Sequence, residues 1–107
     1  MLYMKKLYVI VRGDLNPGLL AAQACHAAAA FCLNESQLAI DWRTDQNLIV
    51  LSSPTKESLA KLLYELIKHG IKTIHFQEPD LNNELTAIAC REEAKPLIRQ
   101  LKLALAA

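Results

Sequence analysis

Gln23 and His26 are the polar side chains of an otherwise apolar, alanine-rich stretch that runs from Pro17 to Leu33. An imidazole can transfer protons near neutral pH, and a nearby amide can orient a water molecule or a substrate. Arg12 and Asp14 stand just before this stretch. Two interpretations stay open: a polar pocket with acid–base chemistry, or a structural pair that satisfies backbone groups at the edge of a sheet.

A second group of candidate residues is acidic. Glu78, Asp80 and Glu84 lie within the short segment "QEPDLNNE". Three carboxylates in a turn can simply be solvated. Alternatively, a carboxylate at the end of a strand can orient a water molecule or a histidine for general acid–base catalysis.

Other familiar sites are not predicted. Cys25, His26 and Cys32 lack the spacing of zinc ligands, and so we expect no metal. The chain has neither a G-x-x-x-x-G-K-[ST] loop nor a G-x-S-x-G elbow. Three cysteines without a C-x-x-C pair favour reduced, buried thiols over a disulfide framework.

Composition places the chain among globular proteins. Its 107 residues suit a single domain over 1–107, and 52% of them are hydrophobic. The formal net charge of +1 does not by itself indicate nucleic-acid binding. We expect no membrane segment and no signal peptide, which makes a cytoplasmic location the default.

The periodicity predicts the elements that must position these residues. We expect strands over 5–12, 47–53, 71–76 and 84–90 and helices over 17–33 and from about 54 to 70. Asn16 can cap the first helix, Ser53 or Thr55 can cap the second, and Gly70 marks its end. Residues 34–46 suggest a short helix and a loop, and the tail after Arg91 suggests a short helix or an extended segment.

The order of these elements predicts an α/β fold with a small four-stranded mixed sheet and helices packed on its faces. Ligands in open α/β sheets bind at the carboxyl ends of strands, which is where Arg12 and Asp14 are expected. The loop from Gly13 to Gly18 leads into a helix N-terminus, which favours anionic groups. Gln23 and His26 are expected at the border of the packed face of that helix.

The motif R-x-D-L followed by A-A-Q-x-x-H-A resembles the start of the type II peptidyl-tRNA hydrolase family. It comprises Arg12, Asp14, Leu15, Ala21, Ala22, Gln23, His26 and Ala27. The resemblance continues through "VLSSPTKESLAKLLYELIKHGI" and "TIHFQEPD…ELTAIA" and so covers nearly the whole chain. The chain is most similar to a compact bacterial-type variant of the family.

The resemblance implies an activity: hydrolysis of the ester that joins a peptidyl or aminoacyl group to tRNA, without a metal or an organic cofactor. It also implies a homodimer. Carried over by motif, the catalytic residues would be His26, Gln23, and Glu78 or Asp80. The resemblance gives substrate-binding roles to Arg12, Asp14 and Thr86.

One departure from the family pattern favours an alternative. Family members usually carry a glycine- and lysine-rich turn after D-L, whereas this chain has the shorter "NPGLL", which has no lysine. The alternative is a non-catalytic module that binds a ligand or a protein and retains the fold. Basic residues gathered near Gln23 and His26 would favour the hydrolase, and scattered ones the binding module. The residues to compare are Lys5, Lys6, Arg12, Arg43, Arg91, Lys95, Arg99 and Lys102.

Overall fold

The structure, a computed structural model, describes residues 4–106. The helices and strands follow the chain in the order β1 (Lys6–Arg12), α1 (Pro17–Asn34), α2 (Ser36–Trp42), β2 (Asn47–Ser53), α3 (Lys56–Lys68), β3 (Thr73–Glu78), β4 (Glu84–Arg91), α4 (Lys95–Ile98) and β5 (Lys102–Leu103). Single 3₁₀ turns precede β4 (Pro79–Leu81) and α4 (Glu92–Ala94).

The strands form one mixed sheet in the order β3-β4-β1-β2-β5. β1 and β2 are parallel, and every other neighbouring pair is antiparallel. The α/β class is confirmed, but the expectation of four strands is wrong, because the sheet has five. The fifth strand pairs two residues of the tail, Lys102 and Leu103, with β2. A strand of two residues is too short to show the alternation that reveals strands in a sequence.

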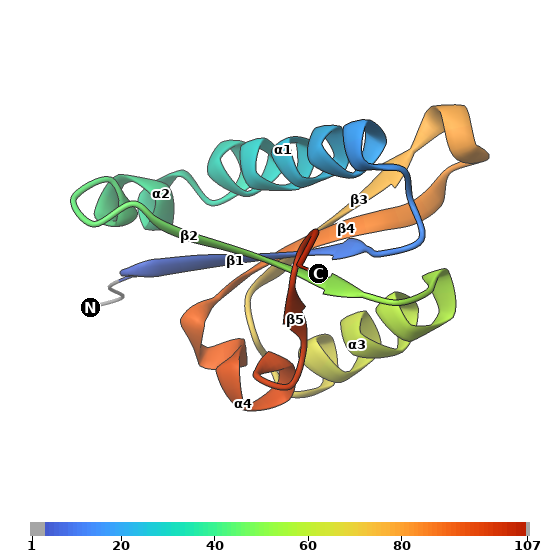
Figure 1. Cartoon of the computed structure of the whole chain (residues 1–107). Helices are drawn as coiled ribbons and strands as arrows, with labels where there is room; N and C mark the ends of the chain where they lie inside the picture. Colours follow the sequence, from blue (N-terminus) through green and yellow to red (C-terminus); the bar gives the residue numbers. More distant parts are fainter. Residues whose placement is uncertain (1–3, 107) are drawn as a thin grey trace.

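Helices cover both faces of the sheet. α1 and α2 lie on one face, and α3 and α4 lie on the other (Figure 1). β1 runs between them, and its side chains alternate: Val9 and Val11 belong to the core under α1, whereas Ile10 belongs to the core under α3. This alternation follows from the period of two in a strand.

The two long helices begin and end where the sequence predicted. The side chain of Asn16 accepts a hydrogen bond from the Leu19 amide (2.9 Å) and so caps α1. Of the two candidate caps for α3, the structure selects Thr55, which forms a reciprocal capping box with Ser58. Gly70 follows α3 with a φ of 71°, a conformation that favours glycine.

Two expectations need correction. The third strand starts and ends two residues later than expected, at Thr73 and Glu78, because Gly70 is followed by two residues of irregular chain. Of the three cysteines, only Cys90 is buried, and burial raises the pKa of its thiol to about 12. Cys25 is exposed and Cys32 is half-buried, because both lie outside the sheet-facing stripe of α1.

Candidate functional site

Gln23 lies in the buried stripe of α1 with its side chain at 0% exposure. It takes the place of an apolar residue in the series Leu20, Gln23, Ala27 and Phe31. A buried amide must be hydrogen-bonded at both ends to avoid a desolvation cost. Its Nε2 donates to the Glu78 carboxylate (2.7 Å), and its Oε1 accepts from the Thr86 hydroxyl (2.6 Å).

Thr86 reaches Gln23 because of a β-bulge. In the pairing of β3 with β4, Phe76 lies opposite Ala87, but the next residue, Gln77, lies opposite Leu85. Thr86 is therefore the extra residue of β4 at this bulge. Regular alternation would place Thr86 on the same face as Ile88, which packs under α3. The bulge turns the Thr86 hydroxyl to the opposite face, where Gln23 accepts its hydrogen bond.

Glu78 closes this network at the end of β3. Its second carboxylate oxygen accepts a hydrogen bond from the Asp80 backbone amide (3.2 Å), and the residue is 9% exposed. The bond from Gln23, followed by the Asp80 amide and the nearby His26, holds the pKa of Glu78 below its ordinary value. The carboxylate is therefore ionised at neutral pH. We call Gln23, Glu78 and Thr86 the buried network.

His26 lies one turn further along α1, at the surface. Its ring stacks on Phe76 with the centroids 4.5 Å apart and the planes 8° from parallel. Within residues 4–106, no hydrogen bond engages its ring nitrogens. The stacking fixes the plane of the imidazole, while the nitrogens stay open to solvent or to a ligand.

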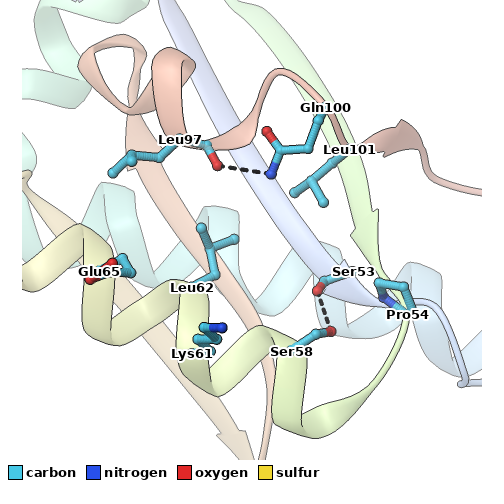
Figure 2. A pocket seen from close by; sticks show the side chains of 9 residues that line it. All are labelled: Ser53, Pro54, Ser58, Lys61, Leu62, Glu65, Leu97, Gln100 and Leu101. Atoms are coloured by element: carbon cyan, nitrogen blue, oxygen red, sulfur yellow. Dashed lines mark hydrogen bonds between the residues drawn. The ribbon is translucent and has the colours of Figure 1, made fainter.

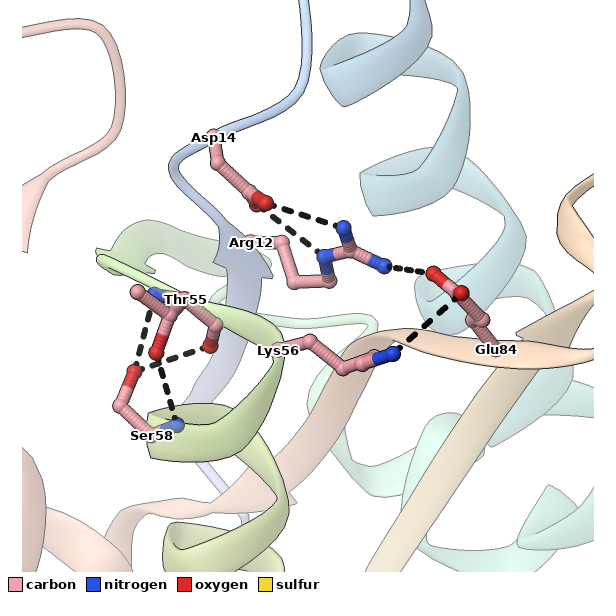
Figure 3. Close-up of polar contacts among 6 residues, drawn as sticks. All are labelled: Arg12, Asp14, Thr55, Lys56, Ser58 and Glu84. Carbon is pink, nitrogen blue, oxygen red and sulfur yellow. Dashed lines mark hydrogen bonds and ion pairs between the residues drawn. The ribbon is translucent and has the colours of Figure 1, made fainter.

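A second, ionic cluster lies at the same end of the sheet. Arg12 makes two hydrogen bonds to Asp14 (3.1 and 2.9 Å) and one to Glu84 (2.8 Å), and Lys56 from α3 reaches the other Glu84 oxygen at 3.3 Å (Figure 3). Arg12 is buried, whereas the side chains of Asp14 and Lys56 are each 44% exposed. The guanidinium lowers the pKa of the Asp14 and Glu84 carboxyls. We call these four residues the ionic cluster.

The two groups adjoin each other, because Glu78 and Glu84 are partners in the pairing of β3 with β4. The side chains of Gln23, Glu78 and Thr86 are hydrogen-bonded to one another, and those of Arg12 and Asp14 are paired in the adjoining ionic cluster. His26 lies next to Glu78 but contacts Phe76. Asp80 joins them through its backbone amide rather than its carboxylate.

Lys56 was not among the residues singled out in the sequence. Its position could have been inferred, because Thr55 caps α3 two residues after β2 ends. The first residue of that helix must then lie at the carboxyl edge of the sheet.

The basic residues named above do not gather at this site. Of these residues, Arg12 is the one that belongs to the ionic cluster. Lys6 starts β1, and Arg91 pairs with Leu7, so both lie at the opposite end of that strand. Around the site itself, the carboxylates of Asp14, Glu78 and Glu84 outnumber the cations of Arg12 and Lys56.

The described part of the chain offers neither a metal cluster nor a membrane span. Among residues 4–106, no three His, Cys, Asp or Glu side chains are grouped so that they could hold a metal ion. No helix in that range combines the length and the apolar character needed to cross a bilayer.

Comparison with known proteins gives three findings. The family model described as peptidyl-tRNA hydrolase PTH2 matches residues 5–104. No curated protein matches the chain significantly. Among solved structures, a protein of unknown function from Agrobacterium tumefaciens strain C58 is similar at 14% sequence identity and a TM-score of 0.68, with 95% of this chain and 98% of that chain covered. At that identity the structural likeness shows the fold alone.

Proposed function

The chain belongs to the peptidyl-tRNA hydrolase PTH2 family, and on that premise we propose that it hydrolyses the ester between a peptidyl or aminoacyl group and tRNA. The observation that carries this proposal is the buried network. An apolar residue at position 23 would pack the helix on the sheet without any need for partners. Instead, a fully buried glutamine holds an ionised carboxylate beside an exposed histidine. Perturbed carboxylates next to such groups are typical of catalytic sites.

We assign the role of general base to His26. Its ring nitrogens are open, whereas both oxygens of Glu78 already accept hydrogen bonds. A carboxylate with a lowered pKa is also a weaker base. In this mechanism His26 removes a proton from water as the water oxygen attacks the ester carbonyl carbon. The negative charge of Glu78 stabilises the imidazolium that forms.

The second step returns the proton. The tetrahedral intermediate collapses, the bond between the carbonyl carbon and the ribose oxygen breaks, and the imidazolium protonates the departing oxygen. The products are tRNA with a restored hydroxyl and a carboxylic acid, which releases its proton to solvent and becomes a carboxylate. Neither step requires a metal or an organic cofactor.

Gln23 and Thr86 act here as positioning residues. Gln23 is fully buried and each end of its amide is hydrogen-bonded within the protein, so the amide does not reach an attacking water molecule. Thr86 is fully buried, so we assign it the task of fixing Gln23 rather than of contacting substrate. Arg12 and Lys56 form the cationic part of the rim and are suited to a phosphate of the tRNA end.

One observation favours the alternative, a non-catalytic binding module. The basic residues are scattered, and the site edge carries more acidic than basic side chains. A tRNA-binding surface normally gathers cations against the phosphates. The homodimer and the cytoplasmic location remain predictions.

Single-turnover hydrolysis of N-blocked aminoacyl-tRNA separates the two functions. We expect His26→Ala to lower the rate by at least about 100-fold, which is the usual contribution of a general base. His75→Ala is the matched control, because His75 is also exposed and lies on β3, next to Phe76 but on the other face of the sheet. Absence of cleavage by the folded wild type at high enzyme excess would reject the hydrolase and leave the binding module.

A further inference from the structure

A cleft lies where the tail crosses the carboxyl end of β2, away from the buried network. It consists of two adjoining hollows of about 270 and 450 Å³, and Pro54, Gln100 and Leu101 line both of them. The first hollow is formed between α3 and the tail (Figure 2). The second extends around the end of β2 to Gly13 and Lys102.

The first hollow is lined by both apolar and polar side chains. Leu62 of α3 and Leu97 of the tail contribute apolar surface, and the hydroxyls of Ser53 and Ser58 meet at 2.5 Å near Pro54 (Figure 2). Lys61 and Glu65, one helical turn apart on α3, balance each other in charge. This part of the cleft suits an uncharged, largely apolar group.

The second hollow carries an unbalanced positive charge. Within the part of the chain that the structure describes, Lys102 is the charged residue lining it, and no ion pair engages that lysine. Ser52 lies opposite Lys102 in the pairing of β2 with β5, so a hydroxyl and an ammonium stand on the same face. Gly13 lies next to them, and its backbone amide donates a hydrogen bond to the Ser53 carbonyl oxygen (2.7 Å).

The topology of the sheet independently predicts a ligand-binding crevice at this cleft. β1 and β2 are parallel neighbours, and the chain leaves β1 towards α1 on one face but leaves β2 towards α3 on the other (Figure 1). The carboxyl ends of two such strands form a crevice, which is where open α/β sheets bind ligands. Gly13 and Pro54, which follow these two strands, both line the cleft.

We propose that this cleft is a second binding site, for a small organic anion with an apolar body. The carboxylate or phosphate of the ligand lies between Lys102 and Ser52, and its apolar body lies between Leu62 and Leu97. The buried network lies outside this cleft, whereas the ionic cluster borders it at Gly13, which stands between Arg12 and Asp14 in the chain.

The test is a titration of the full chain with phenyl phosphate, followed by amide chemical shifts in two-dimensional NMR. We expect shifts at Ser52, Ser53 and Leu101 and none at Gln23 or His26. Phenol, which lacks the anion, should leave the spectrum nearly unchanged. Lys102→Ala should raise the Kd about tenfold, the usual effect of losing one charge-assisted hydrogen bond.

Lys68→Ala is the matched control, because Lys68 ends α3 outside the cleft and should bind like the wild type. The same spectra report whether each variant is folded. The proposal is overturned if phenyl phosphate causes no shifts at millimolar concentration, if phenol causes the same shifts, or if Lys102→Ala and Lys68→Ala bind equally well.

Discussion

The buried network and the ionic cluster lie side by side at one end of the sheet, yet they are held by different forces. In the buried network, a neutral amide at 0% exposure links a carboxylate to a hydroxyl through bonds of 2.7 and 2.6 Å. In the ionic cluster, full charges meet in side chains that are up to 44% exposed. Buried hydrogen bonds are costly to break, whereas exposed ion pairs are screened by water and salt.

We infer from this difference that the buried network holds the site residues in place, whereas the ionic cluster is the part that a ligand can contact. Gln23 is fully buried and each end of its amide is hydrogen-bonded within the protein, so it can hold Glu78 in place but is not accessible to a ligand. The ionic cluster keeps Lys56 half in solvent with a single partner at 3.3 Å, and so this side chain can exchange partners at low cost.

Gln23→Leu should have the largest effect. The leucine removes both hydrogen bonds, so Glu78 is no longer held beside His26, and we expect single-turnover hydrolysis to fall by at least about 100-fold. Gln77→Leu is the control, because Gln77 is an exposed glutamine of β3. Hydrolysis by Gln23→Leu at the wild-type rate would show that the buried network serves packing alone.

Thr86→Val should lower the free energy of unfolding by about 1–3 kcal/mol, because it leaves the buried Gln23 carbonyl oxygen without a donor. Urea denaturation measures this change. Thr86→Ser keeps the hydroxyl and should recover most of the loss of hydrogen bonding. Equal stability of the valine and wild-type proteins would contradict the importance of this bond.

The stabilisation from Glu78 should depend on pH in one direction. The folded protein lowers the pKa of this carboxyl, so its contribution is present above about 4.5, the ordinary value, and is lost as the pH falls through the lower value of the folded state. The difference in free energy of unfolding between wild type and Glu78→Gln should therefore narrow on acidification. Urea denaturation at a series of pH values measures this difference. A difference that widens on acidification would contradict a lowered pKa of Glu78 in the folded protein.

Lys56→Ala should have the smallest effect on stability, less than about 1 kcal/mol, because its ion pair with Glu84 is exposed. Its effect should appear in KM rather than in kcat if Lys56 contacts tRNA. With Arg12 and Lys56 as the cations of the rim, the slope of log KM against log salt concentration should not exceed about 1.4. Lys72→Ala is the control, because that lysine pairs with Glu35 away from the site.

Local patterns in the sequence were sufficient to predict most of the helices and strands. Pro17 after Asn16, Thr55 before α3 and Gly70 after it mark helix ends through interactions within a few residues. The motif around Arg12, Gln23 and His26 indicated the family, which the match over residues 5–104 confirmed. These features depend on residues that are close together in the chain, and so a sequence can display them directly.

Tertiary structure decided the rest. Thr86 faces Gln23 only because a bulge in the pairing of β3 with β4 reverses the alternation, and nothing in β4 alone requires that bulge. Likewise, β5 forms because the tail pairs with the edge of β2. Lys56 reaches Glu84 because the end of β2 and the start of β4 lie at the same edge of the sheet. The sequence predicted which residues form the candidate site, and the structure decided how they contact one another. Their contacts span up to 72 positions of the chain, as from Arg12 to Glu84, and contacts over such separations are set by the packing of whole elements.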